Sequence, residues 1–295
     1  MKRRRGGGRP SLSTWLFVIP ALGAYVAFLV SPALQSIGLS FTDWNGMSRS
    51  RNFIGIGNYV RIFDDPTAMT AMGNNLLWTV VTIIVPVVLG LLLAVFLNGA
   101  AAFKPFLRTV FYMPAVLPMV GVATIWTWLY DPTYGSINAF LRQVGLGSLA
   151  QSWLGQDSTA FGAIMVAGVW VRTGFPMLIY LASLQTIPAE LYEAAKVDGA
   201  NAWQSFWYIT MPRLRAGHYV VLALSLVDSF KVFDIVYAMT YGGPGNSTQV
   251  LGTWMYFNVF QYFDAGYGIS LAVVITIVAV LSGIPYVISQ MKADK

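Results

Sequence analysis

Two apolar segments of the chain each carry a few polar side chains that are able to bind a ligand. In the first segment, residues 161–184, Val171, Arg172 and Phe175 lie close together. A guanidinium group at the centre of a lipid-facing helix costs about 2.5 to 3.5 kcal/mol on insertion scales. Arg172 is therefore expected to face the protein interior. A guanidinium group beside an aromatic ring suits a ligand that is rich in hydroxyl groups.

The second segment, residues 219–239, places its polar side chains on one stripe. Positions i, i+3, i+4 and i+7 of a helix share a face, and four residues have this spacing: Ser225, Asp228, Ser229 and Val232. The carboxylate and hydroxyl groups of this stripe are able to hydrogen-bond a polyhydroxylated ligand. A purely structural role is the alternative, in which Arg172 and Asp228 only pair with each other. Lys231 offers a further pairing, with Asp228 or with Asp234.

The elements that position these side chains are membrane spans. The chain has 295 residues, of which 56% are hydrophobic and only 10% are charged, whereas a soluble domain carries about 25% charged residues. Each apolar stretch of about 20 residues is long enough to cross a hydrocarbon core of about 30 Å. We predict six spans, at approximate residues 15–37, 76–97, 110–130, 161–184, 219–239 and 269–289.

These spans divide the chain into a basic tail at residues 1–14, a transmembrane domain at 15–290 and a short tail at 291–295. A basic start followed by an apolar run also describes a secretory signal peptide. The first run is long, contains Pro20 and lacks a convincing cleavage site. We therefore expect it to be an uncleaved helix.

The distribution of lysine and arginine predicts the orientation. With the N-terminus in the cytoplasm, the outer loops hold four basic residues and two fall within spans. The inner segments hold twelve of the 18, which follows the positive-inside rule and places both termini and the loop at 185–218 in the cytoplasm. The twelve are Lys2, Arg3, Arg4, Arg5, Arg9, Lys104, Arg108, Lys196, Arg213, Arg215, Lys292 and Lys295.

Several kinds of chemistry are disfavoured by the composition. The chain has no cysteine and one histidine, His218, so neither a thiolate metal site nor a Ser-His-Asp system is expected. None of its six lysines follows a glycine, which excludes a P-loop for ATP. We predict no catalytic residue, no metal site and no cofactor. The net charge of +6 is concentrated in the N-terminal flank, which indicates a membrane flank rather than a nucleic-acid partner.

The cytoplasmic loop contains the stretch "EAAKVDGANAWQSFWYITMP" from Glu193 to Pro212. Good helix formers precede Gly199, which suits the left-handed position that ends a helix. Asn201 and Gln204 then have capping-box spacing for a second short helix. The small side chains around Ala194 make a knob that suits a groove on another protein. The alternative is a reentrant hairpin or a pair of interfacial helices without a partner.

This stretch resembles the EAA motif of permease subunits in binding-protein-dependent ABC importers. The match consists of Glu193, Ala194, Ala195, Gly199 and "ITMP", which ends at Pro212. The segments "LASLQTIPAELY", "FIGIGNYVRIF" and "FDIVYAMTYGGPGNST" narrow the resemblance to the maltose and glycerol-3-phosphate branch, and to the first of its two paired permeases. "ITMP" stands where the family often has "ITLP", a change that conserves side-chain volume.

The resemblance implies an all-α, six-span type I importer permease in a prokaryotic cytoplasmic membrane. Its partners would be a second permease, two ATP-binding subunits and an extracytoplasmic substrate-binding protein, with a sugar or oligosaccharide as cargo. The EAA segment would be a coupling helix that docks in a cleft of the ATPase through Glu190, Glu193, Ala194, Ala195, Asp198, Gly199 and Pro212. The substrate contacts it implies are Val171, Arg172, Phe175, Ser225, Asp228, Ser229 and Val232.

Two other classes of membrane protein fit the sequence less well. A self-contained secondary transporter usually has inverted repeats and coupling-ion carboxylates in several spans, whereas the plain intramembrane carboxylates here are Asp228 and Asp234. A membrane enzyme would require a nucleophile or a metal set. The sequence leaves open which sugar is carried and whether the ATPase is dedicated or shared.

Overall fold

The computed structural model describes residues 12–99 and 103–293, and within these ranges the regular elements are helices. The predicted tail at 1–14 lies mostly outside the described residues, as does the end of the tail at 291–295. The all-α prediction is confirmed for the described part. The α-helices are α1 (Leu12–Tyr25), α2 (Ser31–Leu39), α3 (Gly57–Asp64), α4 (Pro66–Asn98), α5 (Lys104–Tyr112), α6 (Met119–Leu129), α7 (Ser136–Gln143), α8 (Asp157–Leu184), α9 (Ala189–Val197), α10 (Ala202–Ser205), α11 (Met211–Arg213), α12 (Arg215–Ser229), α13 (Asp234–Thr240), α14 (Leu251–Phe260) and α15 (Ala265–Ala293).

Four helical stretches in the described part are long and apolar enough to cross a membrane. They are Val18–Leu39, Pro66–Asn98, Asp157–Leu184 and Ala265–Ile284. The first joins α1 to α2 through a π-helical turn at Val26–Val30. The spans predicted at 15–37, 76–97, 161–184 and 269–289 fall on these continuous helices.

The predicted span at 110–130 is bent. The helical stretch Lys104–Val116 meets α6 at an angle of 103°, so the two together are a broken span or a reentrant loop. The bend has a local cause, because a residue before proline is pushed out of the helical region. Leu117 precedes Pro118 and is extended, with ψ at 140°.

The predicted span at 219–239 is two helices rather than one. α12 ends at Ser229 and α13 begins at Asp234. The amide of Lys231 bonds to the carbonyl oxygen of Asp228, a tight turn of the kind that ends helices. Val232 therefore lies in the break, outside the helical stripe on which the sequence pattern placed it.

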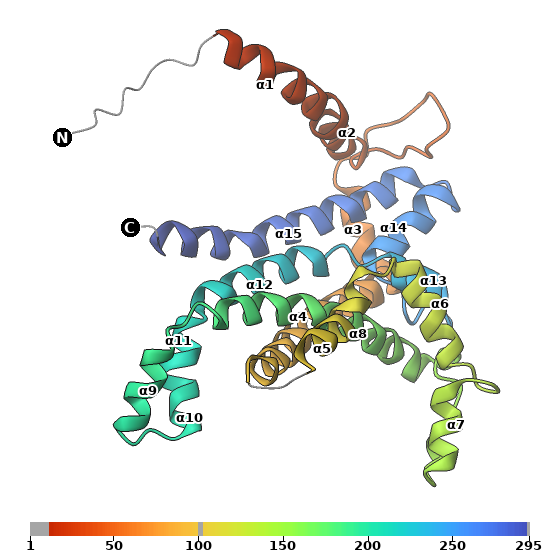
Figure 1. Ribbon diagram of the computed structural model, residues 1–295. Coiled ribbons are helices and arrows are strands. Elements are labelled where there is room, and N and C mark those ends of the chain that lie inside the picture. Colours follow the sequence, from red (N-terminus) through yellow and green to blue (C-terminus); the bar gives the residue numbers. More distant parts are fainter. Residues whose placement is uncertain (1–11, 100–102, 294–295) are drawn as a thin grey trace.

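The long helices α4 and α8 pack against each other over much of their length (Figure 1). Small residues permit the close approach, as is usual between membrane helices. A Cβ atom on Gly168 would lie 2.4 Å from the ring of Trp78, and one on Gly90 would lie 2.7 Å from Pro176. α12 packs against α4, α8 and α15, which completes the central group of helices.

The loop helices occupy opposite ends of this group. Figure 1 shows the loop with α9, α10 and α11 at one end, and α13 with α14 at the other. A buried apolar cluster underlies the first end, where α8 meets the start of α12 through Tyr180, Leu214 and Val221. Two further clusters lie towards the opposite end: one surrounds Trp78 and Val236, and the other surrounds Trp254 and Tyr267. α1 and α2 lean away from the group, and their apolar side chains from Val18 onward are largely exposed.

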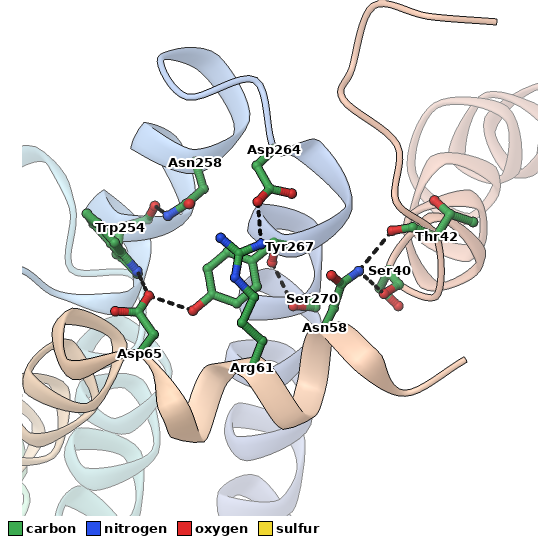
Figure 2. Close-up of polar contacts among 10 residues, drawn as sticks. All are labelled: Ser40, Thr42, Asn58, Arg61, Asp65, Trp254, Asn258, Asp264, Tyr267 and Ser270. Carbon is green, nitrogen blue, oxygen red and sulfur yellow. Dashed lines mark hydrogen bonds and ion pairs between the residues drawn. The ribbon is translucent and has the colours of Figure 1, made fainter. Parts of the chain in front are cut away.

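A polar network joins the segments before α4 to α14 and α15 (Figure 2). Asp65 caps α4 by accepting a hydrogen bond from the Thr67 amide at 2.8 Å. The same carboxylate accepts from Trp254 Nε1 at 2.8 Å and from the Tyr267 hydroxyl at 2.7 Å. Arg61 lies 4.2 Å above the Tyr267 ring and pairs with Asp264. This set fixes the end of the molecule opposite the α9–α11 loop.

Candidate functional site

A cavity of about 440 Å³ opens between α8 and α12. Its size falls within the range of small-ligand sites. Five of the seven predicted ligand-binding residues line it: Val171, Arg172, Phe175, Ser225 and Asp228. The sequence pattern therefore selected side chains from two separate helices that face one space.

Arg172 lines the cavity and is contacted from two sides, by Asp228 and by Trp78. Its side chain is 16% exposed, and its Nη2 lies 3.6 Å from Asp228 Oδ2. The guanidinium carbon lies 5.1 Å from the ring centroid of Trp78, in cation–π range. Nη1 is buried and has no hydrogen-bond partner among the described residues. A buried donor without a partner is unfavourable, so this nitrogen is unsatisfied in this conformation.

Asp228 keeps most of its carboxylate open to the cavity. Its side chain is 60% exposed, and a separation of 3.6 Å is too long for a good charge-assisted hydrogen bond. The pairing expected under the structural alternative is thus present but loose. Lys231 also lines the cavity, and with Asp234 it lines an adjoining cavity of about 200 Å³.

Ser229 and Val232 are placed differently from the other five residues. Ser229 is fully buried, and its hydroxyl donates to the carbonyl oxygen of Leu226 at 2.7 Å. Val232 is buried in the cluster around Trp78, although it borders the smaller adjoining cavity. Neither residue lines the larger cavity.

Sequence reasoning did not identify two parts of this site. Trp78 supports Arg172 from α4, but a tryptophan in an apolar helix has the same pattern as one that faces lipid. A third wall comes from Ala115, Leu117 and Met119, around the bend before α6. Pro114 and Pro118 marked that bend as irregular in the sequence, but they did not indicate that it would reach the cavity.

The loop between α8 and α12 presents the predicted docking residues. Glu190, Glu193 and Ala194 are exposed on α9, and so are Asp198 and Gly199 after it; Pro212 is exposed on α11. Ala195 is half-buried. The carboxylates and the small side chain of Ala194 therefore form one accessible surface at the end of the molecule.

The break at Gly199 has the predicted geometry. Gly199 has φ of +84°, a conformation that glycine adopts without steric cost. The Ala200 amide bonds to the Ala195 carbonyl oxygen at 2.8 Å, and the Gly199 amide bonds to that of Lys196 at 3.2 Å. These two bonds form a Schellman motif, which closes α9.

The second short helix of the loop starts at the predicted cap. The Asn201 side chain accepts from the Gln204 amide at 2.9 Å, and the Gln204 side chain accepts from the Asn201 amide at 2.8 Å. α9 is tied to this second arm by a hydrogen bond of 2.9 Å between the hydroxyls of Tyr192 and Thr210. The loop is therefore a closed helical hairpin.

The fold and these two features define a class of protein. A helical chain with several membrane-spanning stretches, a cavity that contains the charged pair Arg172 and Asp228, and a folded loop at one end has the architecture of a membrane permease. Comparison with known transporter families assigns the chain more specifically. The chain belongs to the family described as binding-protein-dependent transport system inner membrane components, which matches residues 66–291. It is thus a multi-pass inner-membrane permease of an ABC importer and not itself the ATPase.

Individual relatives cover nearly the whole chain. The probable ABC transporter permease protein YurN of Bacillus subtilis is 38% identical over 90% of this chain and 91% of its own length. The trehalose/maltose transport system permease protein MalF of Thermococcus litoralis is 33% identical, over 91% and 90% respectively. A bacterial alginate ABC transporter, solved in complex with an alginate pentasaccharide-bound periplasmic protein, has the same fold: its TM-score is 0.81 at 22% identity, covering 93% of this chain and 92% of that one.

Proposed function

We propose that this permease carries a sugar or oligosaccharide and is the first of two paired permeases in its importer. Relatives described as sugar permeases support the cargo. The observation that carries most weight is that the same two helices, α8 and α12, bear both the cavity and the exposed loop. A movement of the loop therefore acts directly on the walls of the cavity.

The cavity is the proposed passage for the sugar. Arg172 donates to sugar hydroxyls through its guanidinium group, while Asp228 accepts from them. Phe175 is placed to stack on a sugar ring, and Val171 and Ser225 form further parts of the lining. Ser229 and Val232 remain in the proposed site as residues behind it: Ser229 secures the last turn of α12, and Val232 packs in the cluster around Trp78.

The loop is the proposed coupling element. α9 enters a cleft on an ATP-binding subunit, with Glu190, Glu193, Ala194 and Ala195 forming the knob. Asp198 and Gly199 set the angle at which the knob projects, and Pro212 lies at the end of the second arm, before α12. Two such ATPases close on ATP and rock the two permeases between inward-facing and outward-facing states. A binding protein delivers the sugar from outside.

The proposed topology has six crossings and both termini in the cytoplasm. The bent stretch from Lys104 to Leu129 supplies one crossing. The pair α12 and α13 supplies another, with its charged break inside the membrane domain. Irregular backbone of this kind is tolerated at membrane depth where it lines a cavity.

The test is to purify the importer through a tag on this chain and to reconstitute it in proteoliposomes. We expect an ATPase and a second permease to co-purify. Uptake of a labelled sugar should then require both ATP inside and the binding protein outside. Uptake by this chain alone, driven by an ion gradient without ATP, would show instead a secondary transporter.

A further inference from the structure

One polar contact joins α8 to α12 between the exposed loop and the cavity. The hydroxyl of Tyr180 and Nδ1 of His218 share a hydrogen bond of 2.8 Å. Their rings also meet edge to face, with centroids 5.0 Å apart. Tyr180 is fully buried, so water does not compete for its hydroxyl. His218 is the single histidine of the chain, and the transport chemistry described above makes no use of it.

The helices approach closely at this point. A Cβ atom added to Gly217 would lie 2.7 Å from Ser183 Oγ and 3.7 Å from the ring of Tyr180. Leu214 and Val221 are fully buried on either side of His218, in the same apolar cluster as Tyr180. Buried packing on both sides of the contact therefore fixes the position of α12 relative to α8 here. The two helices cannot shift along each other at this point without disturbing the cluster.

The contact lies between the two proposed working parts of the protein. Tyr180 follows Arg172 by eight residues on α8, which is about 12 Å along the helix. His218 precedes Asp228 by ten residues on α12, about 15 Å. On the other side, α9 is bonded through Tyr192 to Thr210, and Thr210 lies four residues before Leu214. A continuous series of packed and bonded groups thus runs from α9 to the cavity.

The geometry points to Tyr180 and His218 as a positioning pair that makes α8 and α12 move together when the loop is displaced. This inference rests on the proposed function, because it assumes that the loop is driven by an ATPase. Without the bond, the loop is expected to move while the two cavity walls follow independently. ATP is then hydrolysed, but the side of the membrane to which the cavity opens does not change. His218 Nε2 is buried and has no hydrogen-bond partner among the described residues, so the Nδ1 bond is the polar contact that fixes the ring.

The experiment measures ATP hydrolysed per sugar transported in the complete importer, reconstituted with its binding protein. Tyr180→Phe removes only a hydroxyl, and His218→Leu removes the ring nitrogens. Both variants should raise the ratio about fivefold or more while the complex assembles in normal amount. His218→Asn keeps a hydrogen-bonding group near the position of Nδ1, so it should restore a ratio close to that of the wild type. The double variant, Tyr180→Phe with His218→Leu, should have a ratio of ATP to sugar no higher than that of the more impaired single variant. This is the result expected for two residues that act through one bond.

The control is Tyr219→Phe, the same change at the next residue of α12, where the phenol is half-buried and makes no hydrogen bond among the described residues. It should leave the ratio unchanged. The inference is overturned if Tyr180→Phe and His218→Leu retain the wild-type ratio, or if His218→Asn is as impaired as His218→Leu. A wild-type complex that shows no ATP-dependent uptake would instead refute the proposed function, so the two failures are distinguishable.

Discussion

Trp254 donates a hydrogen bond of 2.8 Å to Asp65, a residue 189 positions earlier in the chain. This bond links the start of α4 to α14, and the Tyr267 hydroxyl adds α15 through the same carboxylate oxygen. Two long-range bonds and a helix cap therefore depend on one side chain. The carboxylate is the centre of the network at the end of the molecule opposite the α9–α11 loop.

Asp65→Asn is predicted to destabilise the protein by about 1.5 to 3 kcal/mol, the range for hydrogen bonds to a charged group. Asparagine keeps an acceptor oxygen but loses the charge and half of the acceptor capacity. Asp64→Asn, at the exposed neighbouring position, is the matched control. Thermal unfolding in detergent measures both variants. An equal midpoint for Asp65→Asn and Asp64→Asn would contradict the role given to this network.

The same carboxylate predicts an acid-sensitive contribution to stability. Partial burial tends to raise the pKa of Asp65, but hydrogen bonds from Tyr267, Trp254 and backbone amides outweigh it, and the pKa is lowered overall. A lowered folded-state pKa stabilises the fold above the unfolded-state value of about 3.9. This contribution is lost as the pH falls through the lowered value. Unfolding midpoints at a series of acidic pH values should therefore converge for wild type and Asp65→Asn.

Glu193→Lys is predicted to uncouple transport while the protein still inserts in the membrane. The substitution reverses a charge on the exposed face of α9, so it should weaken the contact with the ATPase and abolish uptake. Gln185→Lys adds the same charge at an exposed position that lies before α9, and it should be tolerated. Membrane abundance, co-purification of the ATPase and sugar uptake are measured together. Full transport by Glu193→Lys would show that α9 is not the coupling element.

Gly199→Ala tests the Schellman motif. At φ of +84°, a residue with a Cβ atom is strained by about 1 to 2 kcal/mol, so the loop should shift or fray and transport should fall severalfold. Gly162→Ala is the control, because a Cβ atom there meets nothing within 4 Å and Gly162 lies inside α8. Uptake that is unchanged by Gly199→Ala would mean that the angle of α9 is not critical.

The fold was predictable where a single sequence feature, such as a long apolar run or a glycine, specifies the local structure. Long apolar runs identified the helices that contain 76–97 and 161–184, and the glycine at 199 identified the end of α9. The break between α12 and α13 was not predictable, because Phe230, Val232 and Phe233 continue the apolar run through it. No proline or glycine marks the position, and the helix ends through a local turn that hydropathy does not report.

The candidate site was predictable through its charges. Arg172 and Asp228 are costly in lipid, so each had to face the interior, and the two lie together in the structure. The two serines, Ser225 and Ser229, were weaker indicators of which side chains line the cavity. Ser225 and Ser229 share a face in an ideal helix, yet Ser229 satisfies its hydroxyl on the Leu226 carbonyl at the last turn. Trp78 and the wall at Leu117 come from other helices, and only the folded structure brings them to the cavity.

The chain contains no cysteine, which makes its topology directly measurable. Val197→Cys on α9 is predicted to react with an impermeant thiol reagent only from the cytoplasmic side. Tyr134→Cys, in the loop before α7, is predicted to react only from outside. Both positions are suitable because their side chains are 87% and 90% exposed. Labelling of both cysteines from the same side would refute the proposed orientation.

The central claim is that the cavity between α8 and α12 is the passage for the sugar, and Asp228→Asn tests it most directly. Asp157→Asn, at an exposed position that does not line the cavity, is the control. The measurement is the concentration dependence of sugar uptake by the reconstituted importer, with ATPase activity stimulated by the loaded binding protein recorded on the same preparation. We predict that Asp228→Asn assembles normally but raises the uptake KM about tenfold or abolishes uptake, while Asp157→Asn transports normally. Wild-type uptake kinetics for Asp228→Asn, or failure of this variant to assemble, would contradict the account.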